Sequence, residues 1–267
     1  MKNAFAIATF CFEKGDSRRY VDFANRALEK WSQYFPVYIQ TNLENEFKKY
    51  NVLYQDLQIM SVEEGQKLSE TEKAKLDFNK LWTYHDRVDI VYHALQHNEI
   101  CFHIDCDHIP TEKTFDILSK NIDQINNLRP GLHFGRSWEE TDVKDSPNGF
   151  IYPEWGYFEH FDFFHYIRDN IGFSPAKNLK PVQESFYFAR RFNEWPDVRR
   201  LMKEKYKKIF IENDLKVFSW KDKSPWRSVG RADGLSYALT AEELNIKNFY
   251  TDFTLIREIE NSMEIHY

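Results

Sequence analysis

The beginning of the chain joins two apolar runs through one amphipathic segment. Residues 5–12 are almost entirely apolar, which is typical of a strand buried on both faces. Residues 15–17 (Gly-Asp-Ser) break this run and offer helix caps. Apolar residues then recur at helical spacing: Val21, Ala24, Leu28 and Trp31. A second apolar run at residues 37–40 completes a predicted strand–helix–strand unit.

The middle of the chain repeats this alternation. Residues 44–79 are polar and irregular, and we predict there a short strand at residues 52–54 followed by a helix. One helical stripe consists of Leu81, Tyr84, Val88, Val91 and Leu95. It predicts a helix over residues 81–95 that leads into a strand at residues 100–104. A later stripe consists of Phe115, Leu118, Ile122 and Ile125. This alternation predicts an α/β fold.

Length, charge and cysteine content narrow the class of protein. A chain of 267 residues can bury a substantial core, and we expect a single domain over residues 1–267. The net charge of −6 argues against a nucleic-acid partner. Cys11, Cys101 and Cys106 have no metal-binding spacing, so we expect buried, reduced thiols. The beginning of the chain does not resemble a signal peptide, and no apolar stretch is long enough to span a bilayer, so we expect a cytoplasmic protein.

Two aspartates follow the predicted strand at residues 100–104. Side chains two residues apart on an extended chain leave on the same side, so Asp105 and Asp107 project together while Cys106 points away. Open α/β sheets bind ligands beyond the carboxyl ends of their strands, and adjacent carboxylates repel unless a cation or a shared proton offsets the charge. A divalent metal is the simplest occupant. The alternative is a polar strand end that caps the following turn.

These aspartates, Asp105-Cys106-Asp107, resemble the DxD motif of glycosyltransferases of the GT-A fold. Residues 231–250 look like the acid-bearing turn, helix and strand of that fold. The family has Glu-Asp where this chain has Ala232-Asp233, so only the aspartate carries over. His266 is similar to a late histidine that completes the metal shell in many members. The resemblance implies a Rossmann-like, mixed and mostly parallel central sheet flanked by helices.

The resemblance also implies an activity and a metal. A sugar would move from a nucleotide-sugar donor, UDP-linked in this interpretation, to a glycan or lipid-linked glycan acceptor. Residues 1–130 would bind the donor, and residues 131–267 would bind the acceptor and supply catalytic groups. Asp105, Asp107 and His266 would hold Mn²⁺ or Mg²⁺, with the imidazole favouring Mn²⁺. The composition, rich in Lys, Asn and Phe, favours a bacterial surface-polysaccharide enzyme.

Several further side chains are candidates for donor binding. Thr9, Phe10 and Asn42 lie at the ends of the first two predicted strands, where a nucleoside would enter the crevice. Asp105 is a candidate contact to the ribose or the sugar. Lys80 or Arg87, beside the helix before the DxD motif, would reach phosphates; otherwise both are solvated helix charges. Alternative phosphate ligands are Arg227 and Arg231.

Two acids are candidates for catalysis. Asp233 would take the acceptor proton in an inverting reaction, and its alternative role is an ordinary helix N-cap. Glu184 lies in a predicted strand over residues 182–188 and shares strand parity with the apolar positions there. A carboxylate on an apolar face needs a partner or a function. It would contact donor or acceptor, or it would form a buried ion pair with Arg190 or Arg231.

Other regions keep two interpretations each. Aromatic residues crowd residues 150–166, where Trp155 is our first candidate for stacking on an acceptor sugar, although most of these rings belong to a core. Residues 190–209 form a cationic amphipathic helix that would lie on the inner face of a membrane, or would pack into the fold. His266 is a metal ligand or a surface residue.

Two other functions compete with glycosyl transfer. A haloacid-dehalogenase-type phosphatase also uses a strand-end DxD motif, but it needs threonine or valine where Ile109 stands, and its motif comes near the first strand. A non-catalytic sugar-binding domain would explain the aromatic residues and would leave the ordered acids unexplained.

Overall fold

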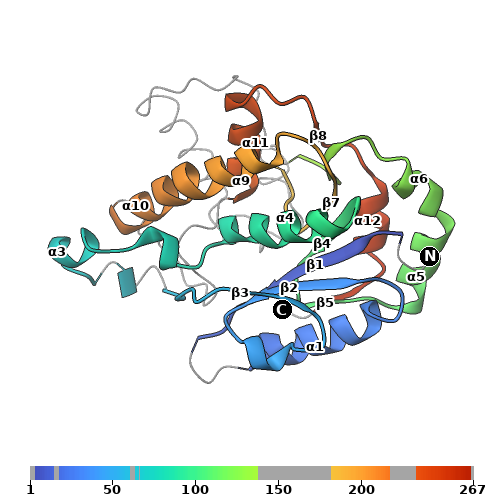
Figure 1. Cartoon of the computed structure of the whole chain (residues 1–267), viewed down its shortest axis with the longest axis horizontal. Coiled ribbons are helices and arrows are strands. Elements are labelled where there is room, and N and C mark those ends of the chain that lie inside the picture. Colours follow the sequence, from blue (N-terminus) through green and yellow to red (C-terminus); the bar gives the residue numbers. More distant parts are fainter. Residues whose placement is uncertain are drawn as a thin grey trace, which may run out of the picture.

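The computed structural model describes residues 4–14, 18–60, 64–65, 67–137, 182–216 and 233–265. Its centre is a seven-stranded sheet of order β3-β2-β1-β4-β7-β6-β8 (Figure 1). The strands of this sheet are β1 (Ala6–Cys11), β2 (Val37–Thr41), β3 (Asn51–Tyr54), β4 (Ile100–Ile104), β6 (Gly131–Phe134), β7 (Phe186–Arg190) and β8 (Phe249–Tyr250). A separate two-stranded sheet is made of β5 (His108–Ile109) and β9 (Glu264–Ile265).

The large sheet is mixed and mostly parallel, as expected. β1 pairs in parallel with β2 and β4, β2 with β3, and β6 with β8. Only β7 runs against its neighbours β4 and β6 among the strands described. From β1 the chain moves outward through β2 to β3 and then returns to β4 on the other side of β1. The direction of strand addition therefore reverses between β1 and β4.

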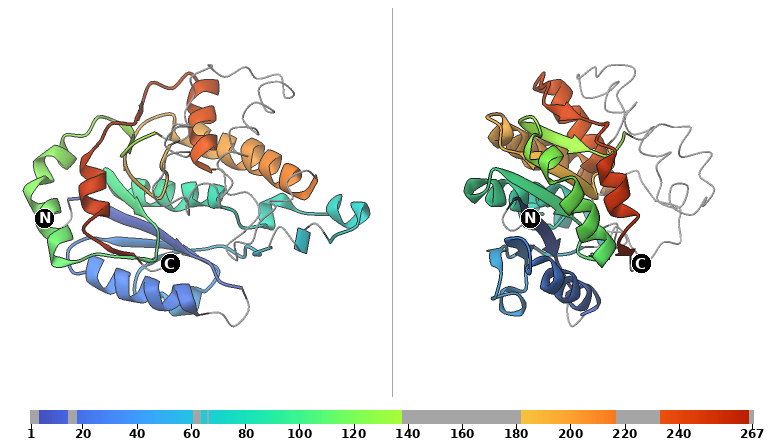
Figure 2. Two further views of the ribbon diagram at one scale, coloured as in Figure 1. Left: turned by 180° about the vertical axis from the view of Figure 1, so that it is seen from behind. Right: turned by 90° about the vertical axis from the view of Figure 1, so that its right-hand side faces the viewer.

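Helices cover both faces of the sheet (Figure 2). The helical segments of the described residues are α1 (Arg19–Trp31), η1 (Glu44–Glu46), α3 (Glu70–Lys73), η2 (Phe78–Lys80), η3 (Tyr84–Arg87), α4 (Val88–His97), α5 (Glu112–Lys120), α6 (Ile122–Asn126), α9 (Trp195–Leu201), η4 (Met202–Lys207), α10 (Lys208–Lys216), α11 (Asp233–Glu243) and α12 (Leu255–Glu260). Alternation along β1 divides the core: Phe5 and Ile7 pack with α1, α5 and α12, while Ala6 and Ala8 pack with α4, α9 and α11. Each face of β1 thus has its own apolar layer.

The predicted elements mostly exist, with three differences in their bounds. The helix predicted over residues 81–95 begins only at η3. The residues before it stay extended, because the Trp82 amide donates a hydrogen bond to Gln58 O and the Gln58 amide donates one to Lys80 O. Among the described residues of the polar region 44–79, the helical elements that accompany β3 are short turns. The strand predicted over residues 182–188 begins later, at β7.

Two other expectations can be compared with the described residues. Cys11, Cys101 and Cys106 are all buried and free, as predicted. Within the described ranges, no helix combines the length and the apolar character needed to cross a bilayer.

Candidate active site

The candidate site lies at the carboxyl ends of β1 and β4. Ligands of open α/β sheets bind where the direction of strand addition reverses, and in this sheet that point lies between these two strands. Asp105 directly follows β4, and Phe10 lies near the end of β1. The register pairs Ala8 with His103, so the two strand ends lie side by side.

Arg87 is the centre of this site, although its side chain is only 3% exposed. Its Nη1 lies 3.3 Å from Asp105 Oδ1, and its Nε lies 3.2 Å from Asp233 Oδ2. Its guanidinium also lies over the rings of Tyr84 and Phe10, at 4.4 Å and 4.9 Å from the ring centroids. Burial alone would lower the pKa of Arg87, but the neighbouring carboxylates outweigh burial and raise it. Arg87 therefore stays charged and holds the acids together.

Asp233 and Glu184 meet at the first turn of α11. Burial raises the pKa of Asp233 to about 6, although the charge of Arg87 opposes this shift. Burial also raises the pKa of Glu184 to about 8, and the charge of Asp233 adds to the effect. Near pH 7 the carboxyl of Asp233 is mostly ionised while that of Glu184 is mostly protonated. Two acids whose pKa values are pushed apart can take different roles in one reaction.

Glu184 reaches this turn because Gly234 has no side chain. A Cβ at Gly234 would lie 2.4 Å from Val182 O and 2.5 Å from Glu184 Oε2. Val182 N donates a hydrogen bond of 3.1 Å to Gly234 O, which holds the two segments together. A glycine is needed here for close approach, and the approach brings the two acids to one place.

Asp107 has a different partner from Asp105. Its Oδ1 lies 2.7 Å from His108 Nδ1. Burial lowers the pKa of His108, but the hydrogen bond to Asp107 and its charge outweigh burial and raise this pKa. The first aspartate of the motif is therefore paired with an arginine and the second with a histidine.

The two aspartates offer oxygen donors that suit a divalent cation. Apart from its ion pair with Arg87, Asp105 Oδ1 is buried with no hydrogen bond inside the described ranges, which fits an oxygen that accepts a cation. Within the same ranges, no three His, Cys, Asp or Glu residues gather closely enough to hold a metal. The third predicted ligand, His266, lies outside the described residues, which end at Ile265. Ile265 pairs with His108 in the small sheet.

The predicted donor-binding side chains have different surroundings. Thr9 is buried, and its Oγ1 has no hydrogen-bond partner among the described residues. Asn42 accepts from the amide of Glu13 at 3.2 Å and donates to its carbonyl at 2.8 Å, so its amide links the ends of β1 and β2. Lys80 is exposed at the end of η2. Arg87 is not a solvated helix charge, because it is buried against carboxylates.

The strand placement predicted for Glu184 needs correction, and one of its two predicted partners is bound elsewhere. It precedes β7 instead of lying within a strand, and it is half-buried, so strand parity does not explain its position. Among the described residues, the charge of Arg87 lowers the pKa of Glu184 in opposition to burial. Arg190 instead forms an ion pair with Glu99 at 3.5 Å, and Arg231 lies outside the described residues.

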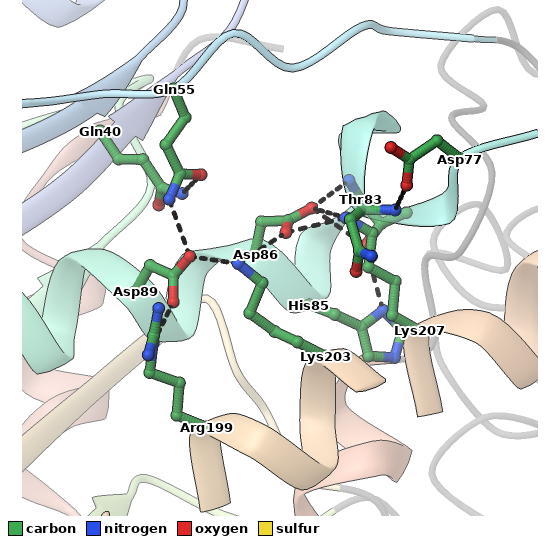
Figure 3. A network of polar contacts seen from close by, with 11 residues as sticks. Gln40, Gln55, Asp77, Thr83, His85, Asp86, Asp89, Arg199, Lys203 and Lys207 are labelled. Carbon is green, nitrogen blue, oxygen red and sulfur yellow. Dashed lines mark hydrogen bonds and ion pairs between the residues drawn. The ribbon is translucent and has the colours of Figure 1, made fainter. Parts of the chain in front are cut away.

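The cationic segment 190–209 packs into the fold and supports the second of its two interpretations. Its apolar residues Val198, Leu201 and Tyr206 are buried. Its ion pairs join Arg199 and Lys203 to Asp89 and Lys207 to Asp86 (Figure 3). A further ion pair joins Lys205 to Glu243. These four cations are paired with carboxylates of the same chain, which favours packing into the fold over membrane contact for them.

Several predicted residues lie outside the part that the structure describes. They are His266, Trp155 with the other aromatic residues of 150–166, Arg227 and Arg231. Sequence reasoning also missed His108, although it directly follows the DxD motif, and it took Tyr84 for a member of an apolar stripe. The charged pair Asp86-Arg87 inside a buried stripe was the available signal that this turn has a special role.

The sequence matches no protein-family model, and a search of curated proteins finds no match. Mouse xyloside xylosyltransferase 1, in its apo form, is 10% identical, with 92% of this chain and 84% of that chain covered and a TM-score of 0.41. The galactosyltransferase LgtC, in complex with donor and acceptor sugar analogues, is 10% identical, with 92% of this chain and 72% of that chain covered and a TM-score of 0.37. A glycosyltransferase involved in glycosylation of the major capsid of PBCV-1 is 11% identical, with 80% of this chain and 76% of that chain covered and a TM-score of 0.34. Because these identities and TM-scores are low, the likeness does not decide the activity; the residues of the site must.

Proposed function

We propose that the protein is a glycosyltransferase that moves a sugar from a nucleotide-sugar donor to a hydroxyl group of a glycan acceptor. The observation that carries the proposal is the cluster at the β1/β4 switch point, where Asp105, Glu184 and Asp233 surround the buried Arg87. Asp107 lies directly beside this cluster in the sequence. Such a site has one pair of carboxylates at a strand end and a second pair with separated pKa values.

Each pair matches one requirement of glycosyl transfer. Breaking the bond between the anomeric carbon and the diphosphate leaves negative charge on the phosphate, which must be offset. Asp105 and Asp107 would hold Mn²⁺ or Mg²⁺, which supplies Lewis-acid stabilisation of that charge when bound. Support for a third ligand comes from β9, which ends at Ile265 beside His108, immediately before His266 in the sequence. The attacking hydroxyl must also lose a proton, which requires a nearby base.

Asp233 is the candidate base, because with a pKa of about 6 it is ionised at neutral pH. It takes the acceptor proton if the reaction inverts the anomeric centre. Glu184, whose pKa is about 8, remains protonated at neutral pH and can donate a hydrogen bond to a sugar hydroxyl. The configuration of the product, read from the anomeric proton coupling in NMR, tests this division of roles. A retained configuration would remove Asp233 as the base and leave it as a charge-stabilising group.

We divide the chain into a donor-binding half and an acceptor-binding half according to which residues supply the groups of the site. The switch point and the DxD motif belong to residues 1–130, so we assign the donor to this half. Glu184 and Asp233 belong to residues 131–267, so we assign the acceptor and the catalytic acids to that half. A UDP-linked donor follows the resemblance of the DxD motif, with Thr9 and Asn42 near the nucleoside.

Metal-dependent ligand binding tests the proposal. The full-length protein should gain thermal stability with at least one nucleotide sugar, and only with Mn²⁺ or Mg²⁺ present, since ligands that bind the native state stabilise it. The same donor should release its nucleoside diphosphate slowly in water. The double variant Asp105→Asn/Asp107→Asn should lose both effects, while Asp116→Asn, an exposed acid on α5, should keep them. Full release by the double variant would contradict the proposal.

The same assay separates the competing functions. Phosphate release from a simple phosphomonoester, without release of nucleoside diphosphate from any nucleotide sugar, would favour a phosphatase. Sugar binding with neither reaction would favour a non-catalytic sugar-binding domain.

A further inference from the structure

A buried polar network lies next to the turn that carries Arg87 (Figure 3). Asp86, the preceding residue, is completely buried. Thr83 N donates a 2.8 Å hydrogen bond to Asp86 Oδ2, so the carboxylate caps its own turn. The same carboxylate faces the helical segment formed by α9, η4 and α10. In this short turn, Asp86 therefore contacts a neighbouring helix, while the next residue, Arg87, lies in the candidate active site.

Lys207 is the partner of Asp86. Its side chain is fully buried, and Nζ donates to Asp86 Oδ1 at 2.9 Å and to Oδ2 at 2.8 Å. Lys203 Nζ lies 3.5 Å from Asp86 Oδ1 and also binds Asp89, which accepts from Gln55 Nε2 at 2.8 Å. Lysine is almost never fully buried unless it is paired. The network therefore has a specific geometry and is not a solvated charge pair.

The helix is shaped to present these cations. Arg199, Lys203 and Lys207 follow each other at four-residue spacing, and all three point to Asp86 or Asp89. In a regular α-helix, three residues at this spacing would drift around the axis by about 80° in total. The π-helical turn η4 has i→i+5 hydrogen bonds and is wider, which reduces this drift. The cations consequently stay on one face.

A second bond fixes the other side of the same turn. His85 Nε2 lies 2.7 Å from Ser236 Oγ, and Ser236 is one turn from Asp233 on α11. The turn is thus bonded to η4 through Asp86 and to α11 through His85. The next residue, Arg87, forms its ion pair with Asp233, which lies on the same helix as Ser236.

We propose that Lys207 is a positioning residue of the active site, acting through Asp86 to hold Arg87 against Asp105 and Asp233. The effect on turnover rests on the proposed glycosyl transfer, whereas the placement of Arg87 does not. A displacement of about 1 Å in a site can cost on the order of 100-fold in rate, so a remote ion pair can matter for chemistry.

The test uses a double variant, Asp86→Asn/Lys207→Met, in the full-length protein. Asparagine keeps an acceptor for Thr83 N, and methionine keeps most of the buried volume, so both charges leave together and the fold should persist. We expect the Nε–H resonance of Arg87, assigned with the Arg87→Lys protein, to shift or broaden in ¹H–¹⁵N NMR spectra. We also expect kcat to fall by about 10-fold to 100-fold with the donor KM nearly unchanged.

The matched control is Lys205→Met. Lys205 lies on the same helical segment and donates to Glu243 at 2.7 Å, at the opposite end of α11 from Asp233. The Lys205→Met variant should leave the Arg87 Nε–H resonance at its wild-type position. If the double variant is unfolded by circular dichroism, Asp86→Asn alone serves instead, because a buried lysine can lose its proton. An unmoved Arg87 resonance in a folded Asp86 variant overturns the proposal whatever the activity. A moved resonance in a protein whose wild type transfers no sugar overturns the proposed function and leaves the positioning role supported.

Discussion

Replacement of Arg87 by methionine should make the stability of the protein depend on pH through the buried carboxyl of Asp233. In the wild type, Arg87 Nε lies 3.2 Å from Asp233 Oδ2 and favours the ionised form. Without that cation, a buried carboxyl remains protonated to higher pH, because burial disfavours its charge. A carboxyl with a raised pKa contributes stability at low pH that is lost as the pH rises through its folded pKa. The variant should therefore lose the most unfolding free energy, relative to the wild type, above pH 6.

The magnitude follows from the pKa of about 6 in the wild type. Protonating such a carboxyl costs about 2 kcal/mol at pH 7.5 and about 0.2 kcal/mol at pH 5.5. If Asp233 stays protonated in the variant at both pH values, the loss of unfolding free energy should be larger at pH 7.5 by about 2 kcal/mol. Asp105, 3.3 Å from Arg87, should change in the same direction.

Urea unfolding of both proteins at pH 5.5 and pH 7.5, with a chelator present, measures this difference. The matched control is Arg191→Met, because the Arg191 guanidinium donates to the carbonyls of Leu95 and Asn98 at 2.9 Å and 3.1 Å instead of to an acid. The loss for Arg191→Met should be the same at both pH values. If Arg87→Met shows an equal loss at both pH values, or a larger loss at pH 5.5, the electrostatic reasoning is wrong.

Three further outcomes are expected. Gly234→Ala should destabilise the fold by about 1–3 kcal/mol in urea unfolding and reduce activity, because its Cβ would lie 2.5 Å from Glu184 Oε2. An unchanged stability and activity would show that the close approach of Glu184 to residue 234 is not needed. Asp107→Asn should lower the pKa of His108 in an NMR titration, because burial alone lowers this pKa; an unchanged titration would remove Asp107 as the cause. In an inverting reaction, kcat/KM should rise with pH through about 6, and Asp233→Asn should lower kcat by about 10²–10⁴-fold; a flat profile would count against this base.

Local pattern was sufficient to predict the sheet region that carries the DxD motif. The apolar run 100–104 ends abruptly at Asp105, so both the strand and its end were visible in the sequence. The first strand–helix–strand unit was equally visible, because its apolar residues repeat at regular spacing. These features depend only on neighbouring residues.

The role of Arg87 could not be predicted in the same way. Its burial depends on Asp105 and Asp233, which are distant in the sequence, and a charge can be buried only where such partners converge. The same holds for Lys207, which looked like one of many cations on an amphipathic helix. Glu184 is half-buried, and a close approach to Gly234 instead of strand parity places it. Such contacts arise from tertiary structure, which a pattern of residues does not encode locally.

The origin of the Arg87–Asp233 ion pair has a consequence for synthesis on the ribosome. The strands β1 and β4 are synthesised before α11, which brings Asp233. Until then Arg87 lacks one of its anions, and the candidate base is absent. Under the proposed function, we therefore expect the nascent chain to bind no donor productively before α11 docks.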